Sequence, residues 1–294
     1  MAINNFNRVI SIKFFPQDTN GNKIPIEDFT KTIRCPTYGR KPNIEITGLQ
    51  TTDECIPSFN LKIKNLYFKD IKNQYPFIEV ELGYAKSTVT IEGTIFYSFT
   101  ESPGPESVTV IQCLMGNSSA WLSKTVNLNL DKGFTLQNAI NQIAMAVGLK
   151  SSLSIKTQSL VSTIAFQFTG KAKDAVQALK KCFSENLIIK SVQSELKVML
   201  SNEANKQTFI HIYLLTTPPQ LIGGENNIAC ATITTLCDFR ITPGTKVIFN
   251  SNFYSTTMTA STTKAYTKMI VSTVNFHFST TSGANEMTIQ GQVL

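Results

Sequence analysis

The chain has 294 residues, of which 42% are hydrophobic and 16% are charged. This length allows one large domain or two to three small ones. No run of 18 uncharged apolar residues occurs, so we expect no transmembrane helix, and the first residues lack the pattern of a secretory signal. The protein is therefore expected to be made in the cytoplasm of its cell.

The formal net charge is +7, which raises the question of a nucleic-acid or membrane partner. The lysines are scattered, and no block of five or six like charges occurs. Short basic segments such as Lys62-Ile63-Lys64 alternate with apolar residues, as solvent-facing positions of a strand do. This favours a solvated basic surface over a dedicated nucleic-acid site.

The six cysteines lie at positions 35, 55, 113, 182, 230 and 237, and none forms a C-x-x-C pair. Only two histidines occur in the chain. A zinc site needs clustered ligands at tight spacing, so no metal site is predicted. The pattern favours free thiols in a reducing compartment over disulfides.

The first third of the chain is rich in short alternating segments. Gly83 is expected to end one strand before Tyr84, and Gly93 to allow a bulge or a sharp coil in the next. Strands at this spacing, bent by glycines, predict a small closed β-barrel. The predicted strands cover residues 8–15, 43–47, 58–66, 77–82, 88–92, 95–99 and 107–114.

The middle of the chain changes to a helical period. Residues 136–147 predict a helix with Thr135 as its N-cap and Gly148 as its stop, and residues 171–184 predict a second helix. A strand is expected over 163–169, and the segments 187–192 and 195–200 read as a hairpin. These elements predict a compact α+β module.

The last ninety residues return to strands, with a turn at Thr242-Pro243-Gly244. Strands are predicted in 209–215, 231–236, 246–250, 269–279 and 287–294. The fold class is therefore mainly β with an α+β module: two small β-barrel domains with an inserted helix-containing domain. The expected domains are a first barrel over residues 1–125, the module over 126–205 and a second barrel over 206–294.

The sequence contains no recognisable catalytic motif. The nucleophile elbow, the phosphate loop, the dinucleotide-binding glycine pattern and the H-E-x-x-H zinc motif are all absent. His211 and His277 are the general-base candidates, and Glu79 with Glu81 is the nearest approach to a carboxylate pair. Each is better explained as a polar strand position. We therefore predict no enzyme, no catalytic residues and no cofactor.

Trp121 is the only tryptophan, and it is interpreted as an anchor at a domain boundary rather than a ligand platform. Nucleic-acid stacking needs exposed aromatic residues among basic ones. Tyr67-Phe68-Lys69 and Tyr84-Ala85-Lys86 are faint candidates for such a surface.

The order of several short motifs resembles the baseplate hub proteins of tailed phages, a tandem β-barrel family shared with contractile injection systems. In chain order the motifs are Asn65-Leu66, Gly83-Tyr84, the I-x-G-x-I of residues 91–95, and Thr109 to Cys113. Looser matches follow at Phe168 to Ala175, at Pro218-Pro219, and from Thr242-Pro243-Gly244 to Phe249 and the following SNFY.

The resemblance implies a structural role. Such a subunit would form a homotrimeric ring that joins the hexameric tail tube to the trimeric spike, contact other baseplate subunits, and let DNA pass through its channel without specific binding. The protein would then be found in the tail or baseplate of the virion. A barrel wall in a ring must curve, so Gly83, Tyr84, Gly93, Pro243 and Gly244 are the candidate structural bends.

Other classes of protein remain open from the sequence alone. One alternative is a tail-tube-like or secretion-system assembly protein with the same barrel. Another is a monomeric β-module that binds carbohydrate or another surface, and a third is a basic nucleic-acid-binding barrel. Oligomeric state separates the hub from the monomeric module, and salt dependence tests for phosphate binding.

Overall fold

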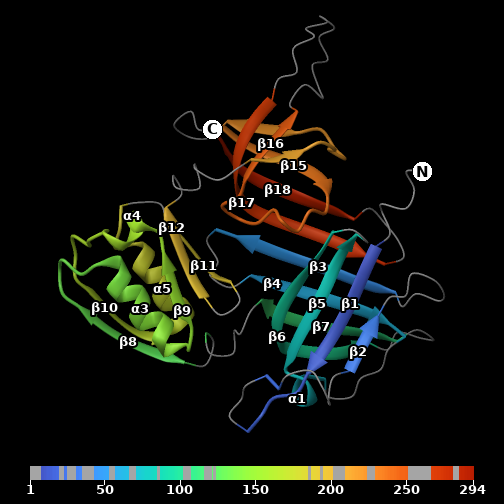
Figure 1. Ribbon diagram of the computed structural model, residues 1–294, viewed down its shortest axis with the longest axis horizontal. Helices are drawn as coiled ribbons and strands as arrows, with labels where there is room; N and C mark the ends of the chain where they lie inside the picture. Colours follow the sequence, from blue (N-terminus) through green and yellow to red (C-terminus); the bar gives the residue numbers. More distant parts are fainter. Residues whose placement is uncertain are drawn as a thin grey trace, which may run out of the picture.

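Figure 1 shows a computed structural model in which two β-rich regions lie one above the other and a smaller helix-containing module lies at their side. The structure describes residues 8–19, 23–24, 31–34, 43–52, 57–65, 71–84, 87–101, 107–115, 121, 124–184, 187–192, 195–200, 209–223, 229–250, 266–280 and 285–294. Cys35, Cys55, Leu66, the segment 67–69 and the SNFY motif at 251–254 lie outside the described residues.

The first β-rich region is built from alternating sequences, as expected. In β4, Phe59, Leu61 and Ile63 are buried while Asn60 and Lys62 are exposed. Its elements are β1 (Arg8–Phe15), β2 (Lys31–Arg34), β3 (Ile44–Thr51), β4 (Ser58–Lys64), α1 (Ile71–Gln74), β5 (Phe77–Tyr84), β6 (Ser87–Glu101) and β7 (Val108–Met115).

Two details around the glycines differ from the expectation. Strand β5 continues through Gly83 to Tyr84, so the strand break expected at Gly83 is wrong; the residue has a φ of 142° and stays paired with Thr88. Strand β6 is one long strand, and its register against β7 shifts between Ile95 and Tyr97 rather than at Gly93. Strand β5 keeps its ladder because a glycine can adopt the positive φ at position 83 at little cost.

The module contains the predicted helices and hairpin. Thr135 caps α3, since its side-chain oxygen accepts a hydrogen bond from the Asn138 backbone N–H, and Gly148 follows the helix with a φ of 73°. The elements are β8 (Thr125–Leu130), α3 (Leu136–Ala146), β9 (Lys150–Leu153), α4 (Ile155–Gln158), β10 (Phe166–Lys171), α5 (Ala172–Lys180), β11 (Leu187–Val192) and β12 (Glu195–Leu200).

The module has a hydrophobic core of its own. The apolar stripes of α3 and α5 pack against β8 and the sheet of β9, β11 and β12, and residues from Trp121 to Leu200 contribute to this cluster. Trp121 is completely buried in it, so the side chain is a packing anchor and not an exposed platform. Its indole N–H has no hydrogen-bond partner among the described residues.

The second β-rich region contains the predicted strands, with differences at their ends, and one strand that was not predicted, β14. The strand expected over 209–215 is limited to β13, which pairs in parallel with β16. The elements are β13 (Ile210–Ile212), β14 (Gln220–Gly223), β15 (Ala229–Leu236), β16 (Lys246–Asn250), β17 (Tyr266–Ser279) and β18 (Glu286–Val293).

One continuous 13-stranded sheet joins the two β-rich regions. Its main path runs β14-β15-β18-β17-β3-β4-β7-β6-β5-β1-β2, so the link between the regions is the antiparallel pair of β3 and β17. Buried residues of both β-rich regions form a single hydrophobic cluster. The chain is thus mainly β with an α+β module, as the sequence predicted.

The β3–β17 pair depends on one close approach. Gly48 of β3 lies directly opposite Phe276 of β17. A Cβ atom on Gly48 would lie 2.3 Å from Cζ of Phe276, whose side chain is buried. Only glycine leaves room for this ring at the joint.

Candidate functional site

The structure places the two histidines on separate strands. His211 is exposed on β13 and its ring stacks on Tyr213 at 5.7 Å between centroids. His277 lies on β17, opposite Glu286 of β18 and Thr47 of β3. Within the described residues, neither imidazole is hydrogen-bonded to a nucleophile, and no group of three or more His, Cys, Asp or Glu side chains could hold a metal ion.

The two glutamates of β5 have structural partners. The Glu79 carboxylate forms an ion pair with Lys23, whose Nζ also lies 4.1 Å from the centre of the Phe15 ring. Glu81 accepts a hydrogen bond of 2.9 Å from the Thr88 hydroxyl on the neighbouring strand. These contacts tie adjacent segments of the first β-rich region together.

Tyr84 lies where the end of β5 meets β17. Its ring packs edge-on against Phe278, with centroids 5.7 Å apart. Burial is the main reason that the pKa of Tyr84 is raised to about 12. The nearby Cys237 raises this pKa further, and Arg8 lowers it. The Gly83-Tyr84 pair therefore supplies an aromatic contact between the two β-rich regions.

Gly93 is a site of close packing between strands. A Cβ atom there would lie 2.9 Å from Cε1 of Phe59 and 3.0 Å from the Leu114 carbonyl oxygen. Both neighbours are fixed, because Phe59 is buried in the core and the carbonyl belongs to the sheet backbone. Whether Gly93 also acts as a bend in an assembled ring stays a prediction, as it does for the other four candidate bends.

The Pro243-Gly244 turn contacts both its own sheet and the module. Gly244 has a φ of 88°, and its backbone N–H donates a 2.7 Å hydrogen bond to the Val271 carbonyl of β17. The Lys190 ammonium of β11 donates to the Pro243 carbonyl at 3.2 Å and to the Thr242 hydroxyl at 3.5 Å. The turn predicted from the sequence is thus a docking point for the module.

A second lysine fixes the module to the first β-rich region. Lys180, at the end of α5, donates a 2.8 Å hydrogen bond to the Thr52 carbonyl just after β3. Sequence reasoning missed both Lys180 and Lys190, because a lysine in an amphipathic segment carries no sign of a distant backbone acceptor.

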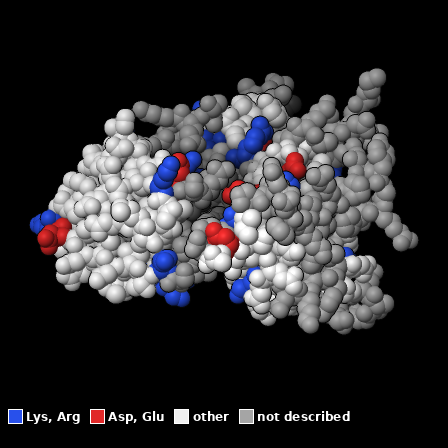
Figure 2. Space-filling model, turned by 60° about the horizontal axis from the view of Figure 1, so that its bottom comes forward, with Lys and Arg blue, Asp and Glu red and all other residues white. Residues whose placement is uncertain are grey.

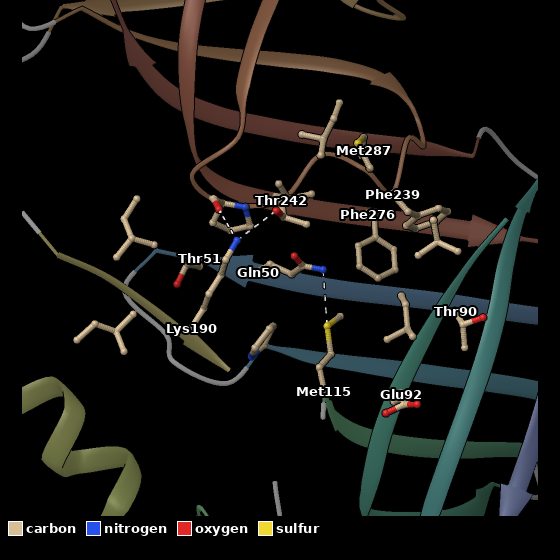
Figure 3. A pocket seen from close by; sticks show the side chains of 18 residues that line it. Gln50, Thr51, Thr90, Glu92, Met115, Lys190, Phe239, Thr242, Phe276 and Met287 are labelled. Atoms are coloured by element: carbon tan, nitrogen blue, oxygen red, sulfur yellow. Dashed lines mark hydrogen bonds between the residues drawn. The ribbon is translucent and has the colours of Figure 1, made fainter. Parts of the chain in front are cut away.

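A cavity of about 210 Å³ lies where the module and the two β-rich regions meet. Figure 3 shows side chains from β3, β6, β7, β11 and the second β-rich region converging on it. Most of the lining is apolar, and Lys190 and Glu92 are its two charged residues. In this view Lys190 points toward Thr242 on one side, and Glu92 lies on the other side of the cavity.

The surface charges in Figure 2 are dispersed. On this face the described Lys and Arg residues stand singly or beside acidic groups, and the module presents a broad uncharged area. Such a pattern agrees with a solvated surface more than with a phosphate-binding stripe. None of the helices described is long and apolar enough to cross a membrane.

Searches at the sequence level find no matching family model and no matching characterised protein. Solved structures show a clear similarity of fold. The tail protein from Neisseria meningitidis MC58 matches with a TM-score of 0.63 at 9% identity, over 98% of this chain and 97% of that one. The 43 kDa tail protein of prophage MuSo2 from Shewanella oneidensis matches with a TM-score of 0.59 at 9% identity, over 97% and 96%.

A chain of the Francisella PdpA–VgrG complex is also similar, with a TM-score of 0.61 at 11% identity. The match covers 97% of this chain and 58% of that one. The E. coli c3393 protein, a component of the type VI secretion system, matches with a TM-score of 0.53 at 8% identity, over 86% of this chain and 73% of that one. The fold of this chain is therefore shared with phage tail proteins and with this secretion-system component. This agrees with the hub resemblance seen in the sequence.

Proposed function

We propose that this chain is a structural hub protein of a phage tail or baseplate. In this role it forms a homotrimeric ring that joins the tail tube to the central spike and lets DNA pass on ejection. The observation that carries the proposal is the match of fold over nearly the whole of this chain and nearly the whole of a prophage tail protein. The role needs no catalysis and no cofactor.

Exposed apolar side chains on the second β-rich region support an assembly role. Strand β14 is an edge of the large sheet, and its Leu221 and Ile222 are more than half exposed. Tyr213 and Leu214, after β13, are also exposed. A solvent-exposed apolar edge strand can pair with a strand of another chain, so we expect a protein partner to cover it.

Light scattering after size exclusion, over a range of protein concentrations, tests the proposal. A trimer of three 32.5 kDa chains is the expected result. Leu221→Lys should weaken the trimer, because the lysine ammonium on β14 would be desolvated when a neighbouring subunit covers this edge. Ile155→Lys, a matched change at an exposed residue of the module, should leave the mass unchanged. A monomer at all concentrations, unaffected by either change, contradicts the trimer.

A second candidate is an assembly component of a secretion system. The similarity of fold to the E. coli c3393 protein, a component of the type VI secretion system, favours it. Both roles use the same barrels in a ring, so the genes neighbouring this one distinguish them: tail and capsid genes support the phage hub, and secretion-apparatus genes support the alternative.

A further inference from the structure

The cavity between the module and the two β-rich regions has the properties of a small-molecule site. Its apolar wall comes from parts of the chain that are distant in sequence and includes Met115, Ile188, Phe239, Val274, Phe276 and Met287. An enclosed apolar cavity of about 150 Å³ is enough to bind benzene in a protein. A volume of about 210 Å³ therefore has room for one aromatic ring with a short chain.

Lys190 places a positive charge at one end of this apolar space. Its two acceptors, the Pro243 carbonyl and the Thr242 hydroxyl, are neutral, and among the described residues no carboxylate pairs with it. Burial lowers the pKa of Lys190, with a further contribution from Lys197, because the charged form lacks compensation. An anion at this end would supply that compensation.

Glu92 sets the direction in which an anionic ligand would lie. Its carboxylate is about half exposed and is 4.0 Å from the Lys23 ammonium. Figure 3 shows it across the cavity from Lys190. A ligand with one negative group would therefore place that group at Lys190 and keep its apolar part among the methionine and phenylalanine side chains.

We propose that this cavity binds a small organic anion with an apolar body, of the size of an arylalkyl carboxylate. The carboxylate accepts a hydrogen bond from the Lys190 ammonium, and the apolar body fills the space beside Met115 and Met287. A ligand there would contact the module and both β-rich regions at once. The inference does not depend on the hub role.

The test uses the full chain and three probes that share one apolar body: phenylpropionate, phenylpropanol and phenylpropylamine. Binding is measured by calorimetry and by NMR of methyl-labelled methionine. Phenylpropionate should shift the Met115 and Met287 signals and leave Met145, exposed on α3, unchanged. It should bind roughly tenfold more tightly than the alcohol, since a charged hydrogen bond is gained, and the amine should bind least.

Lys190→Gln keeps an N–H donor for the Pro243 carbonyl and removes the charge. It should abolish the preference for the acid over the alcohol, whereas Lys132→Gln, on an exposed part of the module, should preserve it. Met115→Trp, which fills the cavity, should abolish binding of both probes and remains informative if the Lys190 variant fails to fold.

Three results would overturn the proposal. The first is no shift of Met115 or Met287 with any probe. The second is equal binding of acid and amine. The third is a shift of the Met115 and Met287 signals that depends on the protein concentration and not on the probe concentration. That result would mean that a second copy of the chain occupies the cavity.

Discussion

At the residue scale, most of the sequence-derived candidates turn out to act in packing. Tyr84 joins the two β-rich regions through Phe278, and Gly93 leaves room for Phe59. Glu79 forms an ion pair with Lys23 instead of facing a second carboxylate across a cleft. These residues therefore hold the parts of the chain together by packing and by an ion pair, and none of these roles requires catalysis.

Replacing Gly93 by valine should destabilise the first β-rich region. The new side chain would meet the Phe59 ring and the Leu114 carbonyl, and overpacking of this kind costs about 1–3 kcal/mol. Urea unfolding measures the loss, and light scattering measures assembly. A Gly93→Val protein that assembles normally while His277→Ala does not would refute the structural role of the glycine.

Tyr84 should contribute to alkaline destabilisation. Burial raises its pKa from 10.0 to about 12, so the folded state holds the proton more tightly than the unfolded state. Its contribution to stability is complete below pH 10 and is lost as the pH rises toward 12. Tyr84→Phe should flatten the fall of the melting temperature over this window.

The comparison for Tyr84 needs a Cys237→Ala background. Burial raises the pKa of the Cys237 thiol from 9.0 to about 12, so the thiol titrates over an overlapping range. If Tyr84→Phe leaves the alkaline slope unchanged in that background, the tyrosine is not the group responsible.

At the element scale, the pairing of β3 with β17 is the contact that turns two β-rich regions into one sheet. The two strands are more than two hundred residues apart in sequence, and they meet with seven residue pairs in register. The exposed and buried positions of each strand follow the sequence pattern. The choice of partner depends on Gly48, which admits the Phe276 ring.

Gly48→Ala should weaken this joint. A Cβ atom would overlap Phe276, and the cost of moving a buried ring is about 1–3 kcal/mol. Faster amide exchange in β3 and β17 than in β5 is the expected sign. Thr47→Ala, at the exposed neighbouring position, is the control and should leave exchange in these strands nearly unchanged.

At the scale of the whole molecule, two separate hydrophobic clusters suggest two cooperative units. One is formed by the two β-rich regions and the other lies inside the module. Lys180 and Lys190 make polar contacts between them, and an apolar cavity lies at the same junction. The module should therefore unfold with some independence from the sheet.

Thr135→Ala should reveal this independence. Loss of the N-cap of α3 costs about 1 kcal/mol, and only the module contains α3. Scanning calorimetry should show one of two transitions move to lower temperature, while Gly93→Val moves the other. A single transition that both substitutions shift equally would show that the chain unfolds as one unit.

The sequence by itself determined many of the elements and their buried faces, although it did not predict β2, β8, β9 or β14. The alternation in β4, the helical period of α3 with its Thr135 cap, and the Pro243-Gly244 turn depend on neighbours close in the chain, so local pattern predicts them. The order of short motifs also pointed to the fold that the solved tail proteins share.

Only the tertiary structure decided which faces meet. A periodic pattern shows that a face is buried but not what covers it, so the β3–β17 pair, the lysine contacts of the module and the cavity at Lys190 could not be predicted. The sequence predicted a bulge at Gly93, whereas the register of β6 shifts between Ile95 and Tyr97. This difference has a similar cause. Register depends on the partner strand, and β7 lies beyond any local window.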